Sequence, residues 1–197
     1  LSPSWSSDGG WLAFTSYRNN RPDLYIHNLN ESRNTVISAR EGANISPAWR
    51  PRQFSLAACL SFTGDQELYL LSGTGKIIKR LTHSWGIDVS PTFSPEGKKI
   101  AFVSKRSGTP QIFIKDLDSG DIQRLTFEGK YNTNPSWSPT GDKIAYCGLE
   151  NGHFNIYVID LKKGETFCLT HNQGDNESPA WSPDGEYLAY STGVPGD

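Results

Sequence analysis

The sequence lacks any apolar run that could cross a membrane. No such run approaches the roughly 20 residues that a membrane-spanning helix needs. Helix-favouring patterns are also scarce. The formal net charge is only −2, which gives no electrostatic reason to expect nucleic acid or an anionic membrane as a partner. We therefore expect no membrane insertion and no nucleic-acid partner.

Motifs that mark several enzyme classes are missing as well. The 197 residues contain no Gly-x-Ser-x-Gly nucleophile elbow, no Gly-x-x-x-x-Gly-Lys-Ser/Thr phosphate loop and no His-Glu-x-x-His zinc motif. We therefore expect a protein that is not an enzyme and that uses no metal or other cofactor.

Turn-forming and aromatic residues are plentiful by contrast. The chain has 19 Gly, 12 Pro, 6 Trp and 8 Tyr, and short apolar runs alternate with turn residues. That mixture is typical of an all-β protein.

A repeat of 44 residues is the strongest signal in the sequence. A Ser-Pro-x-Trp-like word recurs at this spacing without insertion, and its aromatic residues are Trp5, Trp49, Phe93, Trp137 and Trp181. The repeats run over about 1–42, 43–86, 87–130 and 131–174, with a partial fifth over 175–192 and a tail over 193–197. The whole of 1–197 is read as one domain.

Each repeat reads as four strands, A to D. Strand A carries the aromatic anchor, and strands B and C are nearly continuous apolar runs such as 100–103 and 112–114. A four-stranded antiparallel sheet that is buried on both faces by its neighbours is the blade of a β-propeller. We therefore predict four complete blades and part of a fifth, with the anchor aromatics packing blade against blade. Carbohydrate stacking on the Trp residues is the less favoured reading.

The second repeat departs from the pattern. The sequence Arg50-Pro51-Arg52-Gln53 replaces the Ser-Pro-acid-Gly turn between strands A and B. We expect a different turn there.

The cysteines and histidines favour structural roles. Cys59 and Cys147 share a repeat position that is filled by small residues in the other repeats, and Cys168 lies two strands from Cys147. Two strand spacings are about 9–10 Å, which is too far for a disulfide. We expect three free thiols. His83 and His171 share a repeat position that Ala39 and Phe127 fill in the other repeats. We therefore favour a structural or loop role for these two histidines over metal binding.

A polar residue recurs in the loops that lead from strand D to the next strand A. Asn44, Asp88, Asn132 and Asn176 each lie five residues before the anchor aromatic. Such residues often form Asx-turns. An alternative is a polar ring at the mouth of the propeller channel that meets a partner or an ion, and both readings can hold.

The D–A and B–C loops are predicted to share one end of the propeller and to bind a partner. They vary from repeat to repeat, unlike the short Gly-bearing A–B and C–D turns, and variable loops on a rigid scaffold are a common place for binding. Exposed Trp, Tyr and Arg often dominate protein–protein contacts. The predicted partner-binding residues are Asn44, Ile45, Trp85, Ile87, Asp88, Lys130, Tyr131, Asn132, Asp175, Asn176 and Glu177.

The repeat words resemble those of the TolB propeller family. The stretches Ser94–Ser104 and Asn155–Leu161 are close to that family's pattern, and the resemblance covers the whole chain. It implies a non-catalytic, periplasmic scaffold of the Tol–Pal envelope system that binds the lipoprotein Pal. The repeat is only moderately specific, because the gating propellers of prolyl-oligopeptidase-type peptidases carry similar words. An engineered propeller fragment is a further alternative.

The same resemblance implies six blades. Six repeats of 44 residues need about 264 residues, so about 67 are expected to lie outside this chain. An incomplete ring would leave a strand edge and apolar blade faces uncovered. We expect such a ring to self-associate or to close as a smaller ring.

Overall fold

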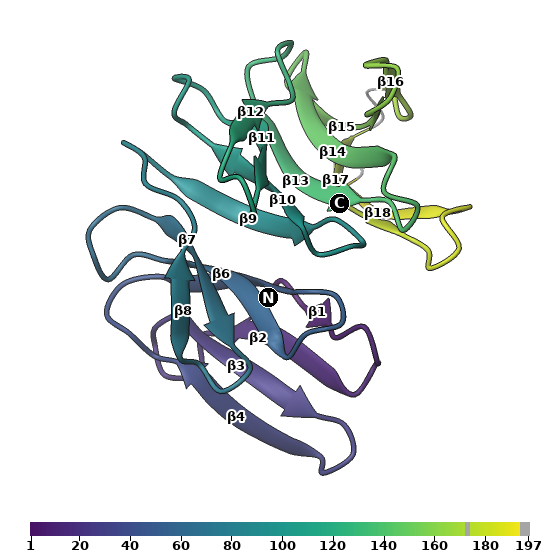
Figure 1. Ribbon diagram of the computed structural model, residues 1–197. Coiled ribbons are helices and arrows are strands. Elements are labelled where there is room, and N and C mark those ends of the chain that lie inside the picture. The colour runs from purple at the N-terminus through teal and green to yellow at the C-terminus, as the bar shows by residue number, and fades with distance from the viewer. Residues whose placement is uncertain (172–173, 194–197) are drawn as a thin grey trace. The chain divides into compact units, whose positions relative to one another are not determined.

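The computed structural model describes residues 1–171 and 174–193, and within these ranges it contains strands and turns but no helix (Figure 1). That part of the chain accordingly has no helix with the length and apolar character to span a bilayer. Most of the predicted tail, 194–197, lies outside the described residues. The chain forms two compact units, Leu1–Phe93 and Ser94–Asp197, and each is described by itself.

The first unit holds two antiparallel four-stranded sheets, in the orders β1-β2-β3-β4 and β5-β6-β7-β8. Strand β9 packs along β5, β6 and β7. The strands are β1 (Ser4–Trp5), β2 (Trp11–Ser16), β3 (Asp23–Asn28), β4 (Arg33–Ser38), β5 (Asn44–Trp49), β6 (Ser55–Leu60), β7 (Glu67–Ser72), β8 (Ile77–Arg80) and β9 (Asp88–Phe93).

The second unit continues the same pattern of antiparallel strands. Strands β10, β11 and β12 pair in that order, β13 to β16 form a four-stranded sheet, and β17 pairs with β18. The strands are β10 (Lys99–Ser104), β11 (Gln111–Asp116), β12 (Ile122–Arg124), β13 (Asn132–Trp137), β14 (Lys143–Glu150), β15 (His153–Asp160), β16 (Thr166–Cys168), β17 (Asp175–Trp181) and β18 (Leu188–Gly193).

Strands B and C are buried on both faces, as the apolar runs predict. All six residues of β6 are buried. Ala13 and Ile26 of the first sheet belong to the same apolar cluster as Trp49, Leu56 and Tyr69 of the second. Packing of one sheet face on the next therefore forms the core of this unit, and burial of apolar surface drives it at roughly 25 cal/mol per Å².

The anchor aromatics hold neighbouring repeats together where they are buried. Trp49 is 6% exposed and Trp137 is 9% exposed. Trp181 is half-buried, and its Nε1 donates to the Ser136 carbonyl of the preceding sheet over 3.1 Å. Trp5 differs, because it is 57% exposed.

A bulge in strand A recurs at the residue before the proline. Ser46, Ser90, Asn134 and Ser178 have φ between 49° and 55°, in the left-handed region that non-Gly residues seldom adopt. The β5–β6 register shifts between Ile45 and Ala48, and equivalent shifts occur in β13 and β17. The repeated Ser-Pro word is therefore the sequence mark of a β-bulge.

The turn of the second repeat is different, as its sequence predicts. In the other repeats a Gly with positive φ donates its N–H to a Ser carbonyl three residues earlier, as Gly97 does to Ser94 over 2.8 Å. Gln53 occupies the Gly position and makes a longer 3.4 Å bond to Arg50. The positive φ of this turn falls on Arg52, at 60°.

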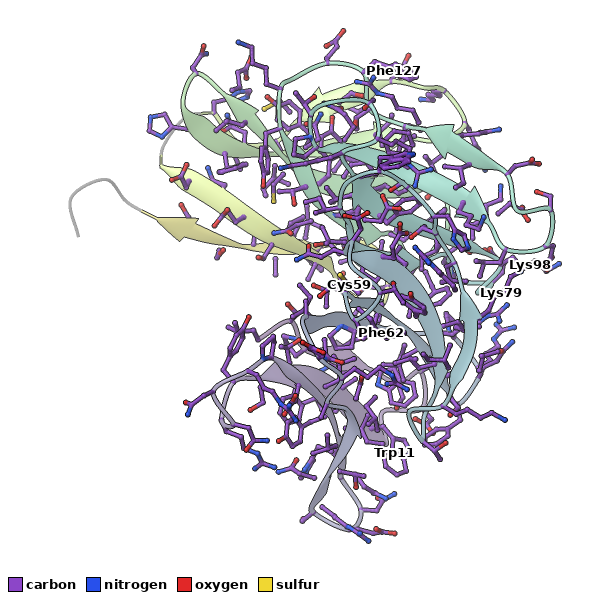
Figure 2. The ribbon with its side chains drawn as sticks, turned by 90° about the vertical axis from the view of Figure 1, so that its left-hand side faces the viewer. Trp11, Cys59, Phe62, Lys79, Lys98 and Phe127 are labelled. Atoms are coloured by element: carbon purple, nitrogen blue, oxygen red, sulfur yellow. The ribbon has the colours of Figure 1, made fainter. Side chains whose placement is uncertain are left out.

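The three cysteines are free thiols, which confirms the prediction. Cys59 lies inside the second sheet (Figure 2). Burial raises the pKa of the Cys59 thiol to about 12, and the nearby carboxylates of Asp88 and Glu67 add to the effect. Burial likewise raises the pKa of Cys147 to about 12. Both residues therefore act as small packing side chains.

Candidate functional site

The D–A and B–C loops lie at the same end of their sheets within each unit, as predicted. Strand register shows this directly. Asn44, at the start of β5, pairs with Leu60 at the end of β6, and Leu60 also pairs with Glu67 at the start of β7. The loops before β5 and after β6 therefore leave the sheet together, and the same holds for Asn132, Gly148 and Asn155 in the second unit.

Buried polar side chains hold the base of these loops. In the second unit, the Gln111 Oε1 accepts hydrogen bonds from Thr126 Oγ1 at 2.7 Å and from Asn132 Nδ2 at 2.9 Å. Asn132 Nδ2 also donates to the Glu128 carbonyl at 2.7 Å, and Gln111 Nε2 donates to the Gly129 carbonyl at 3.0 Å. Strand C, strand D and the D–A loop are thus joined by one network.

The first unit repeats this arrangement with a carboxylate. Glu67 is fully buried and accepts from Thr82 Oγ1 at 2.5 Å and from the Ser84 N–H at 2.7 Å. Arg80 lies 3.4 Å from the same carboxylate. Ser84 Oγ donates to Asp88 at 3.0 Å. A buried charge needs such partners, because its desolvation is costly.

The four residues of the predicted polar ring are structural. Asn44 and Asp88 are 0% exposed, and Asn132 and Asn176 are also buried. The Asn44 Nδ2 donates to the Arg40 carbonyl at 2.7 Å, so it fixes the loop backbone. Side chains in these positions are not available to a partner, because their polar atoms face the loop interior. We therefore remove them from the predicted contact surface and assign them to loop positioning.

Exposed residues remain on the loops of the first unit. Trp85 is 96% exposed. Ile87 on the same loop is half-buried, and so is Ile45, which lies in strand β5. An indole this exposed contributes almost nothing to the core, yet it offers a large apolar contact area. Trp85 is thus the strongest candidate for a binding residue in this unit.

In the second unit, two of the predicted residues contact Phe154, one through its ring and one through its backbone N–H. Tyr131 packs edge-on against Phe154, with ring centroids 5.7 Å apart. Asp175 Oδ1 accepts from the Phe154 N–H at 2.9 Å. Lys130 is exposed and Glu177 is half-buried. Phe127, which is not among the predicted binding residues, is 72% exposed on the same D–A loop as Lys130 (Figure 2).

No cluster of metal-ligating side chains occurs among residues 1–171 and 174–193. The geometry of the described loops is instead a set of exposed aromatic and charged side chains on a hydrogen-bonded base. Such a surface is suited to contact with another macromolecule, since hot spots are enriched in aromatic residues and Arg.

Comparisons with known proteins agree with the repeat. The family model for the TolB β-propeller domain matches residues 1–197. The Tol–Pal system protein TolB of Desulfosudis oleivorans is 66% identical over 86 residues, which is 44% of this chain and 19% of that protein. The chain thus spans about a fifth of the length of this curated relative.

Solved structures show the same fold. The crystal structure of TolB from Acinetobacter baumannii matches with a TM-score of 0.90 and 32% identity, over 99% of this chain and 49% of that one. A nidogen–laminin complex matches with a TM-score of 0.78 at 11% identity, over 96% of this chain and 70% of that one, which is a likeness of fold alone. The predicted all-β propeller fold is confirmed, and the chain belongs to the TolB β-propeller family.

Proposed function

We propose that this chain binds a protein partner of the Tol–Pal system through its D–A and B–C loops, without catalysing a reaction. The named relative is a Tol–Pal system protein, and that system belongs to the cell envelope, which supports a periplasmic location. The partner we propose is a Pal-like lipoprotein. Self-association of the chain stays a prediction.

The observation that carries the proposal is the exposure of Trp85 on a loop whose base is fixed. Ser84, next to it, bonds through its N–H to Glu67 and through its hydroxyl to Asp88. The loop is therefore ordered before binding. Little conformational entropy is lost when a partner covers the indole, and preorganisation of this kind improves affinity.

Calorimetric titration with the soluble domain of a Pal-like lipoprotein tests the proposal. Trp85→Ala should weaken binding by about 2 kcal/mol or more, which is the scale of a hot-spot aromatic. The matched control is Tyr187→Ala, which truncates an aromatic that is 70% exposed at an A–B turn. Equal affinity of the parent chain and Trp85→Ala, or a larger loss in the control, would contradict the proposed surface.

The absence of catalysis has its own test. The purified chain should not turn over peptide or ester substrates, because it lacks a nucleophile motif. Turnover that co-purifies with the chain and survives further purification would overturn that part of the proposal.

A further inference from the structure

A pair of aromatic rings recurs between strands B and C. The strand register places the two residues directly opposite each other, so their side chains are neighbours on one face of the sheet. Both lie toward the end of the strands that the B–C loop connects. The ring centroids are 5.7 Å apart for Phe14–Tyr25, 6.2 Å for Phe102–Phe113 and 5.5 Å for Tyr146–Tyr157.

An arginine of the B–C loop covers this pair in the first and third repeats. The guanidinium of Arg18 lies 4.3 Å from the centre of the Tyr25 ring, and its Nε donates to the Tyr25 hydroxyl over 3.0 Å. Arg106 occupies the same repeat position as Arg18, and its guanidinium lies 5.1 Å from the centre of the Phe113 ring. A cation in this position is attracted by the negative face of the ring.

The second repeat covers its strand C aromatic in another way. Phe62 occupies the arginine position and packs on Tyr69, with ring centroids 5.3 Å apart. Arg80 lies 5.8 Å from the Tyr69 ring, and Arg40 of the preceding D–A loop lies 5.8 Å from the Phe62 ring. Guanidinium groups thus cover the aromatic pair or its neighbour in all of the first three repeats.

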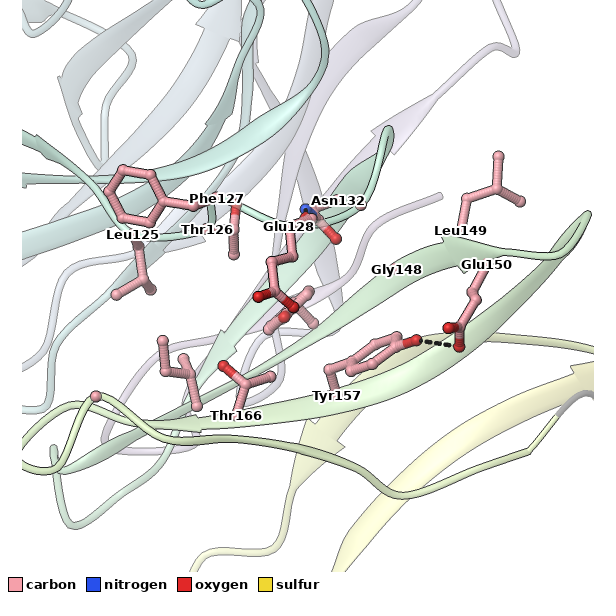
Figure 3. Close-up of a pocket in the computed structure, with 14 residues that line it drawn as sticks. Leu125, Thr126, Phe127, Glu128, Asn132, Gly148, Leu149, Glu150, Tyr157 and Thr166 are labelled. Atoms are coloured by element: carbon pink, nitrogen blue, oxygen red, sulfur yellow. Dashed lines mark hydrogen bonds between the residues drawn. The ribbon is translucent and has the colours of Figure 1, made fainter.

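Two of these arginine positions carry glutamate around the aromatic pair of the fourth repeat, one in its own B–C loop and one in the D–A loop that precedes it. Glu150 occupies the position of Arg18 and Arg106, and Glu128 occupies that of Arg40. Glu150 is an anion, so it cannot make the cation–π contact with the Tyr157 ring that Arg18 and Arg106 make with the rings of their own repeats. It accepts instead a 2.8 Å hydrogen bond from the Tyr157 hydroxyl (Figure 3).

A cavity of about 310 Å³ lies at this place in the second unit. Its walls include Tyr146, Tyr157, Leu149, Phe127, Glu128 and Glu150. Figure 3 shows Glu128 reaching from its loop toward the strands that carry Tyr157. Among the described residues that line the cavity there are two carboxylates and no lysine or arginine. The volume is that of a small ligand site.

Gly148 contributes to the shape of the cavity. A Cβ at this position would lie 2.7 Å from the Tyr157 ring and 3.0 Å from Asn132 Oδ1. The same repeat position holds Ser16, Leu60 and Ser104 elsewhere. Glycine therefore lets the Tyr157 ring lie close to strand β14, and the space beside it stays open.

The guanidinium of Arg124, next in sequence to the cavity residue Leu125, is engaged by other groups. It lies 5.1 Å from the Phe127 ring, and its Nε donates to the Thr126 carbonyl over 2.6 Å. It is therefore held on a different ring from the stacked tyrosines.

We propose that this pocket binds the guanidinium group of an arginine side chain supplied by a protein partner, in the place that Arg18 and Arg106 fill within their own repeats. The stacked tyrosines would accept the planar group on a ring face, and Glu128 and Glu150 would neutralise its charge. The inference rests on the proposed function, because it assigns one contact of the proposed protein partner with the second unit.

The test uses a short capped peptide, acetyl-Gly-Arg-Gly-amide, added to the isotope-labelled chain and followed by amide NMR shifts. Shifts should concentrate at Gly148, Glu150 and Thr166. The same peptide with citrulline has nearly the same shape without the charge, and it should bind roughly tenfold more weakly or worse. Absence of shifts at the pocket at the highest soluble peptide concentration, or equal binding of the citrulline peptide, would overturn the proposal.

Variants on the pocket wall sharpen the test. Glu150→Arg should restore the internal cation and abolish peptide binding, while Glu128→Gln should weaken it several-fold. Glu31→Arg, at an exposed turn of the first unit, is the matched control and should bind like the parent chain. The NMR spectrum of each variant reports whether it remains folded. Unchanged binding by folded Glu150→Arg would contradict the site.

The two proposals fail separately. If the protein partner binds the loops but the arginine peptide does not enter the pocket, only the arginine site is wrong. If the peptide enters the pocket but the protein partner does not bind, the arginine site stands and the proposed function fails.

Discussion

The Asn132 side chain donates a 2.9 Å hydrogen bond to Gln111, which is 21 residues earlier in the chain and at the start of a different sheet's strand C. Both side chains are buried. This bond joins the start of β13 to the start of β11 and fixes the D–A loop between them. A binding loop on such a base presents its exposed residues in one conformation.

Removal of this bond should loosen the second unit. Asn132→Ala removes one of the two donors to Gln111 Oε1 and the side-chain donor to the Glu128 carbonyl, while Thr126 still donates to Gln111. Each lost hydrogen bond of this kind costs about 0.5–1.5 kcal/mol. Urea unfolding should show that loss of stability. The control Asn30→Ala, at an exposed turn, should change the free energy of unfolding by less than about 0.5 kcal/mol. Equal stability of the two variants would show that the network does not anchor the loop.

The two classes of tryptophan should respond differently to truncation. Trp137 is buried at 9% exposure and its Nε1 donates to the Gly141 carbonyl, so Trp137→Ala should destabilise the protein by about 3–5 kcal/mol. Trp85 is almost fully exposed, so Trp85→Ala should leave the stability within about 0.5 kcal/mol of the parent. Thermal unfolding of both variants gives the comparison. A large loss of stability in Trp85→Ala would place that indole in the core instead.

The thiols should differ in reactivity. Cys59 and Cys147 are fully buried with pKa values raised to about 12, whereas Cys168 is partly exposed. Since the thiolate is the reactive form, a disulfide reagent at pH 8 should modify Cys168 first. The other two thiols should react only after unfolding. Rapid modification of all three in the folded protein would contradict the burial.

The raised thiol pKa values also set a direction for pH dependence. Unfolded thiols ionise near pH 8.5, but the native thiols of Cys59 and Cys147 hold their protons to about pH 12. Between these values the unfolded state binds fewer protons, so stability falls as pH rises. Their contribution is fully present below about pH 8.5.

Much of this fold could be predicted from the sequence, because the repeat fixes strand positions by simple counting. The apolar runs at 100–103 and 112–114 lie within β10 and β11, and the turn at Arg50–Gln53 differs as its residues predict. The left-handed Ser46 could not be predicted in this way. A residue before proline normally takes an extended conformation, so the bulge depends on packing between strands.

The site was harder to predict than the fold. The exposure of a loop residue depends on the direction of its side chain, and the 44-residue repeat alone does not give that direction. The sequence pattern therefore predicts Asn132 as a contact residue, whereas in the structure it is buried. The pocket beside Tyr157 was missed, yet the sequence holds a signal for it, since Glu150 stands where Arg18 and Arg106 stand in other repeats.

Hydrogen exchange of the chain with and without a Pal-like lipoprotein shows directly which loops the partner covers. We predict slower exchange in the D–A loops, over 81–87 in the first unit and 125–131 in the second, while the A–B turns at 6–10 and 138–142 exchange as in the free chain. Protection of those turns with unchanged exchange in the D–A loops would contradict the assignment of the binding surface.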